Sequence, residues 1–136
     1  MEQNLIIIGA AIFGILGAAH LIYTFFTNKF NAFDSTVTEA MKGTSPVLTK
    51  ETTIWKAWIG FNASHSLGAM LVAAFYIPLA TSHFNVIQEA AWFSLLPVII
   101  GISYLFLAKL YWFKIPFIGI SISTACFILA AVLINT

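Results

Sequence analysis

A histidine and an asparagine lie in the middle of a long apolar run, in the segment Gly60-Phe61-Asn62-Ala63-Ser64-His65-Ser66. Imidazole and amide groups both donate and accept hydrogen bonds. They are costly to keep in apolar surroundings without partners. A second histidine, His20, follows Gly17-Ala18-Ala19 in another apolar run. We therefore expect any binding or chemistry of this chain to involve these side chains.

Helical spacing gathers the polar residues of these runs. Asn62 is three residues from His65 and four from Ser66, so the three share a helix face, with Trp58 one turn earlier. We estimate the depth of each polar residue at ~1.5 Å per residue, counted from the end of its apolar segment that lies on one common side of the membrane. On this estimate the polar residues lie roughly 9 to 17 Å deep. We predict one polar layer built from the following residues: His20, Trp58, Asn62, His65, Ser66, Tyr104 and Thr124.

Three interpretations of such a layer stay open. It is a structural network that fixes helix register, with contacts worth on the order of 0.6–2 kcal/mol each. It is a site for a small amphiphilic ligand, a substrate or a lipid headgroup. Or His20 and His65 are the axial ligands of a haem in an electron-transfer protein, although their depths differ by about 8 Å. Two histidines are too few for a zinc or copper site.

Catalysis is harder to support. No acidic residue falls inside an apolar run, so a carboxylate dyad or a Ser-His-Asp triad has no buried acid. His65 acts at most as a lone acid or base, which leaves a small-lipid-modifying enzyme as an alternative. We expect a non-enzymatic protein, either a structural or accessory subunit of a larger membrane complex or homo-oligomer, or a small-ligand binder.

The composition of the chain indicates the environment in which it folds. Its 136 residues are 60% hydrophobic and 8% charged, against roughly 25% charged residues in soluble domains. The mean hydropathy is +0.95, and the partner that this predicts is a lipid bilayer. A formal net charge of +1 gives no basic patch for nucleic acid. The single cysteine, Cys126, excludes an intramolecular disulfide.

Four apolar segments each approach the ~20 residues that a membrane-spanning helix needs. They cover residues 5–26, 54–80, 90–113 and 116–134. They predict a single all-α domain over residues 1–136, an integral membrane four-helix bundle. In the first loop, Asp34 precedes a short stretch that ends at Gly43, typical of a capped helix at the membrane surface.

The lysines predict the orientation. Lys29, Lys42, Lys50 and Lys56 lie in or beside the first loop, and Lys109 and Lys114 flank the third. By the positive-inside rule, loops 1 and 3 are cytoplasmic and both termini lie outside a bacterial-type inner membrane.

Packing signals are also present in the apolar segments. Small residues recur every four positions at Ala10, Gly14 and Ala18, and at Gly60, Ser64 and Gly68, which predicts close helix contacts. Pro97 frees a backbone carbonyl of its helix, so that carbonyl needs another donor.

The segment 58–68 around Asn62 and His65, taken with Gly17-Ala18-Ala19-His20, resembles small four-span bacterial membrane proteins of uncharacterised function. In size and span number the chain is similar to the DoxX-like grouping. The resemblance implies a four-helix inner-membrane bundle and brings no activity, cofactor or catalytic residue.

Overall fold

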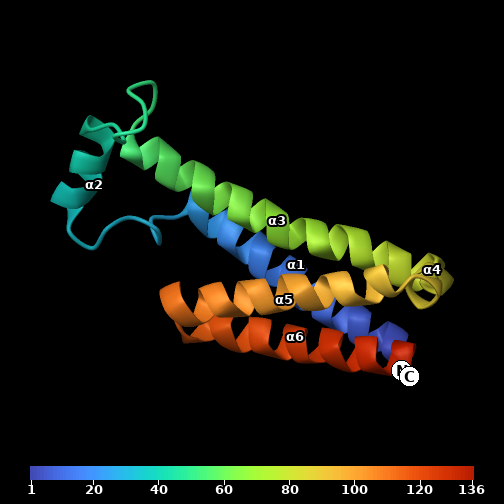
Figure 1. Cartoon of the computed structure of the whole chain (residues 1–136). Coiled ribbons are helices and arrows are strands. Elements are labelled where there is room, and N and C mark those ends of the chain that lie inside the picture. Colours follow the sequence, from blue (N-terminus) through green and yellow to red (C-terminus); the bar gives the residue numbers. More distant parts are fainter. The chain divides into compact units, whose positions relative to one another are not determined.

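The computed structural model describes residues 1–136, and its regular secondary structure is all helical, without strands. Four of its helices are long and apolar enough to cross a membrane: α1 (Glu2–Phe26), α3 (Ile54–Ser82), α5 (Ala91–Tyr111) and α6 (Lys114–Asn135). Two short helices, α2 (Ser35–Gly43) and α4 (Phe84–Glu89), lie between them in the chain (Figure 1). The predicted all-α fold with four spanning helices is confirmed.

The helix ends differ from the predicted ones by a few residues. Helix α6 begins two residues before Pro116, because proline is tolerated in the first turn, where its missing N–H has no helical partner. Helix α1 begins at Glu2, whose negative charge is favourable at the positive end of the helix dipole. The turn expected between the second and third spans contains α4.

The chain forms two compact units, which we describe separately. The first unit comprises Met1–Leu16 and Ala69–Thr136, and the second comprises Gly17–Gly68. The core of the first unit contains side chains from α1, α3, α4 and α6, and the largest of them are at most 2% exposed: Ile6, Phe13, Tyr76, Ile87, Ile120 and Phe127.

Small residues on α1 allow close approach within the first unit. A Cβ atom on Gly14 would lie 2.8 Å from Cβ of Ala73 in α3, and one on Gly9 would lie 2.6 Å from Cε1 of Phe127 in α6. The close contact predicted for the α1 stripe is thus confirmed at Gly14. At Gly60 a Cβ would have no neighbour within 4 Å, so this position makes no close contact with another helix of the same chain. In lipid, a small residue does not have to mark a contact between helices of one chain.

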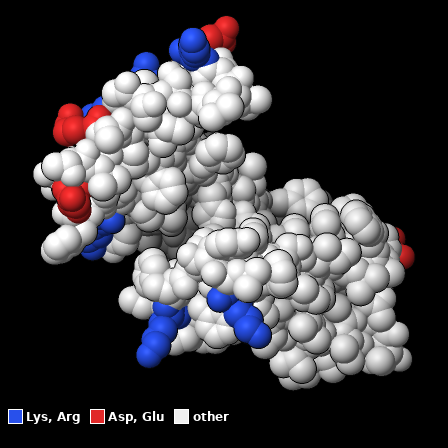
Figure 2. Space-filling model, turned by 60° about the vertical axis from the view of Figure 1, so that its left-hand side comes forward, with Lys and Arg blue, Asp and Glu red and all other residues white.

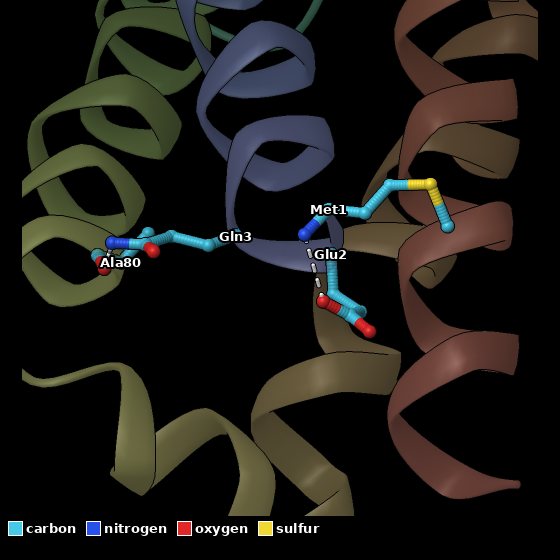
Figure 3. Close-up of polar contacts among 4 residues, drawn as sticks. All are labelled: Met1, Glu2, Gln3 and Ala80. Atoms are coloured by element: carbon cyan, nitrogen blue, oxygen red, sulfur yellow. Dashed lines mark hydrogen bonds and ion pairs between the residues drawn. The ribbon is translucent and has the colours of Figure 1, made fainter.

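Polar side chains join helices of the first unit through backbone groups. The Ser123 hydroxyl donates to the carbonyl of Gly9 at 2.6 Å, which links α6 to α1. At the N-terminal end of α1, the Gln3 amide donates to the carbonyl of Ala80 in α3 at 2.8 Å (Figure 3). The Ala80 carbonyl is one of the last in α3 and has no helical partner, so Gln3 satisfies it.

Proline 97 lies inside α5 and is buried. It cannot donate to the carbonyl of Phe93, four residues earlier. The structure supplies the donor from α3, because the Tyr76 hydroxyl lies 3.1 Å from that carbonyl oxygen. The predicted need for an outside donor is confirmed, and the same contact fixes α3 against α5.

In the second unit, residues 27–53 form the connector between α1 and α3, and its helix α2 is capped as predicted. The Asp34 carboxylate accepts from the backbone N–H of Thr36 at 2.9 Å and from its hydroxyl at 2.7 Å. These hydrogen bonds lower the pKa of Asp34 below its ordinary value, and the bond from the Thr36 hydroxyl contributes most to this shift.

Charged side chains lie along one margin of this region, whereas most of the surface in the view of Figure 2 is uncharged.

Candidate functional site

The predicted site residues of α1 and the first half of α3 all lie in the second unit. His20 comes from the last turns of α1, while Asn62 and His65 come from α3 and share a face of that helix. Asn62 is 9% exposed, and the two histidines are half-buried. The pairing of α1 with α3 at His20 and Asn62 therefore agrees with the predicted polar layer.

A hydrogen bond joins the two helices. Nε2 of His20 lies 2.9 Å from Oδ1 of Asn62, and Nδ2 of Asn62 donates to the backbone carbonyl of Trp58 at 2.8 Å. The second contact fixes the amide, because the opposite orientation would place its oxygen against another carbonyl oxygen. Nε2 of His20 is then the donor. In the neutral imidazole, Nδ1 is left as the acceptor.

The connector completes this arrangement. The indole Nε1 of Trp58 donates to the backbone carbonyl of Phe30 at 3.0 Å, and the Phe30 ring lies 4.4 Å from the ring of His20, centroid to centroid. His20, Asn62, Trp58 and Phe30 thus form a closed cycle of contacts, which we call the histidine cycle. It holds residue 30 of the connector against both helices.

His65 lies beside this cycle. Its imidazole ring meets that of His20 edge to face, with centroids 5.5 Å apart and planes at 65°. Two imidazoles, one from α1 and one from α3, therefore lie side by side. Each neutral ring can donate one hydrogen bond and accept one.

The neighbouring hydroxyl groups bond within their own helices. Ser66 donates to the carbonyl of Asn62 at 2.8 Å, and Thr24 donates to the carbonyl of His20 at 2.8 Å. Such bonds satisfy a buried hydroxyl without a partner helix. Ser66 therefore supports the backbone of the histidine cycle. Its hydroxyl is not positioned as a nucleophile next to a base, because it donates to a carbonyl.

Two predicted members of the layer, Tyr104 and Thr124, belong to the first unit. The Tyr104 ring packs edge to face on Phe13 at 5.1 Å and on Trp112 at 6.3 Å. The Thr124 hydroxyl donates to the carbonyl of Ile120 in its own helix at 2.7 Å. Their described contacts are those of packing residues in α5 and α6.

The site does not suit a metal or a haem. No group of three or more His, Cys, Asp or Glu side chains gathers to hold a metal ion. Axial ligation of one haem iron requires a porphyrin between two imidazoles. The rings of His20 and His65 are in direct contact instead, and Nε2 of His20 is engaged by Asn62.

Comparison with protein-family models, with curated proteins and with solved structures finds no match for this chain. The site must therefore be interpreted from its own geometry.

Phe30 is the member of the histidine cycle that sequence reasoning missed. It lies in the connector, four residues after α1 ends at Phe26, where helical spacing no longer places side chains. The available signal was Trp58, an indole that needs a hydrogen-bond acceptor when it lies near a helix contact. That signal does not say which residue supplies the acceptor.

Proposed function

We propose that this protein is a non-enzymatic, multi-pass membrane protein that serves as a structural or accessory subunit of a larger membrane complex. The observation that carries the proposal is the histidine cycle. In this cycle, the Asn62 amide, the Trp58 indole N–H and Nε2 of His20 all form hydrogen bonds with other groups of the protein. The polar groups of α1 and α3 then hold the architecture together and do not act on a substrate.

The absence of acidic residues from the interior of the spanning helices supports a non-enzymatic role, because no carboxylate is present there to form a catalytic dyad or triad with a histidine. We place loops 1 and 3 in the cytoplasm and both termini outside, on the basis of the six lysines in or beside those loops.

The test is to remove the amide from the histidine cycle. Asn62→Ala should lower the free energy of unfolding in detergent by about 1 to 2 kcal/mol, because it leaves a half-buried imidazole without its partner. Ser64→Ala is the matched control, since Ser64 is exposed on the same helix and bonds to its own backbone. Its effect should be below about 0.5 kcal/mol.

The accessory role is tested with the same two variants in native membranes. The wild-type chain, extracted with its surrounding lipid, should migrate as part of an assembly larger than itself. Asn62→Ala should weaken that assembly in proportion to its loss of stability. A wild-type chain that migrates alone, or only as copies of itself, contradicts the accessory role.

A second candidate is a small-ligand binder, favoured by the contact between the imidazoles of His20 and His65. A small amphiphilic molecule that displaces the Phe30 ring would meet Nδ1 of His20, because the hydrogen bond to Asn62 occupies Nε2 of that ring. Mass spectrometry of small molecules that co-purify with the protein separates the two candidates. A ligand at fixed stoichiometry that His65→Ala abolishes, at a small cost in stability, would replace the structural proposal with this one.

A further inference from the structure

The connector between α1 and α3 carries apolar side chains that no other part of the chain covers. Phe33, Val47 and Leu48 are 93% exposed or more. Scattered exposed apolar residues are ordinary on protein surfaces. Here the exposure is nearly complete, however, and two of the three residues are adjacent. Leaving them in water forgoes about 25 cal/mol for each Å² of apolar surface.

Val47 and Leu48 occupy the tip of a tight turn. The N–H of Thr49 donates to the carbonyl of Pro46 at 3.3 Å, which makes Val47 and Leu48 the two central residues of the turn. Central turn positions normally hold glycine, asparagine, aspartate or serine, because these residues suit the backbone and face water. An apolar pair at this place indicates that the tip meets an apolar phase.

The connector is tethered at the membrane surface at both ends. It leaves one spanning helix at Phe26 and enters the next at Ile54. The N–H of Ile54 donates to the carbonyl of Thr44 at 2.9 Å, so the loop with the 46–49 turn closes at the start of α3. Tyr23 and Trp58, near these ends, are partly exposed aromatic residues of the kind found at membrane interfaces.

Helix α2 has the residue pattern of a helix that lies in a membrane interface. Val37, Ala40 and Met41 fall on one side of it, while Glu39 and Lys42 fall on the other and pair at 2.7 Å. Figure 1 shows α2 crosswise to the start of α3, both within the second unit. In that orientation, an apolar face turned toward lipid leaves the charged pair in water.

We propose that Phe33 and the Val47–Leu48 turn tip insert into the boundary between headgroups and acyl chains of the leaflet around the spanning helices. The occupant of this surface is therefore phospholipid. Lys50 and Lys56 are exposed and follow the turn in the chain, and their ammonium groups would suit lipid phosphates at that surface. Phe30 of the histidine cycle lies three residues before Phe33, so the segment 30–33 attaches to the helices at one end and to the leaflet at the other.

The experiment uses nitroxide labels on the full chain in vesicles of phosphatidylethanolamine and phosphatidylglycerol. After Cys126→Ala, single cysteines are introduced as Phe33→Cys and Leu48→Cys, with Lys42→Cys as the matched control on the charged side of α2. Labels at 33 and 48 should collide with oxygen more often than the control does. Their collisions with a water-soluble nickel chelate should be several-fold fewer.

Two results would overturn the proposal. Labels at 33 and 48 that meet the nickel chelate as often as the label at 42 would show that the turn projects into water. Labels that are shielded from nickel in native membranes but not in the lipid vesicles would show that a protein partner, not lipid, covers this surface. Phe33 and Leu48 are almost fully exposed and Lys42 is exposed, so we expect the labelled proteins to fold, and an unchanged helical circular dichroism spectrum checks this.

Discussion

The contact between Tyr76 and Phe93 offers a quantitative test of how the α3 and α5 helices are held together. Tyr76 is 1% exposed, and its hydroxyl is the described donor to the carbonyl that Pro97 leaves without a helical partner. Tyr76→Phe removes that donor and keeps the ring. Interhelical hydrogen bonds in membranes average about 0.6 kcal/mol and reach about 1.7. Because Pro97 cannot supply the N–H that this carbonyl would bond to in a regular helix, we expect a loss of about 1 kcal/mol or more.

A double-mutant cycle isolates the reason for that loss. Pro97→Ala restores a backbone N–H that can bond to the Phe93 carbonyl, so Tyr76→Phe should cost less than about 0.3 kcal/mol in that background. The coupling energy between positions 76 and 97 should then be at least about 0.5 kcal/mol. The cavity left by the proline ring is common to both arms of the cycle and cancels.

Reversible unfolding in mixed detergent micelles, followed by circular dichroism, measures all four proteins of the cycle. Tyr111→Phe is the control, since Tyr111 is 75% exposed and the same atom is removed. It should change stability by less than about 0.5 kcal/mol in either background. An equal cost of Tyr76→Phe with and without Pro97 would refute the reasoning, because the hydroxyl would then not be replacing the helical donor.

Three further predictions follow from the geometry. Gly9→Ala should destabilise the protein by about 1–3 kcal/mol in the same unfolding assay, because its new methyl group would overlap the ring of Phe127. Gly60→Ala is the control: its methyl group would lie in open space, and it should be neutral or slightly stabilising. The pKa of Asp34 is lowered in the folded protein, so its cap is intact at neutral pH and is lost as the pH falls through that lowered pKa. The amide NMR signals of the first turn of α2 should therefore shift with acid in the wild type but not in Asp34→Asn. Once the native cysteine is replaced, Ser45→Cys in intact cells should resist an impermeant thiol reagent and Thr136→Cys should react, and the reverse pattern would invert the proposed orientation.

Properties that follow from local sequence were predictable from the chain. Hydropathy identified the four spanning helices, because lipid requires long apolar helices whatever their partners are. The Asp34 cap and the helix end at Gly43 followed from short-range hydrogen-bonding rules. The prediction that His20 and Asn62 are satisfied by polar partners followed from the cost of leaving either group alone in an apolar environment, whereas the specific pair comes from the structure.

Properties that depend on distant partners were not predictable in the same way. The sequence required a donor for the carbonyl freed by Pro97, but no rule of spacing identified Tyr76, on another helix, as that donor. Phe30 was missed because the path of a connector has no periodicity. No contact within the chain forms at Gly60, because small residues are common in apolar helices whether or not a neighbouring helix approaches them.

The hydrogen bond from Ser123 to the Gly9 carbonyl bears on how the protein is made. It joins residues 114 positions apart. The ring of Phe127, which lies in α6 like Ser123, also packs against Gly9. During synthesis, α1 enters the membrane long before α6 leaves the ribosome. Its Gly9 surface must remain uncovered, or be held by an insertion factor, until the last helix arrives. A nascent chain arrested before α6 would therefore be a good substrate for membrane proteases, and its degradation would report directly on this late step of assembly.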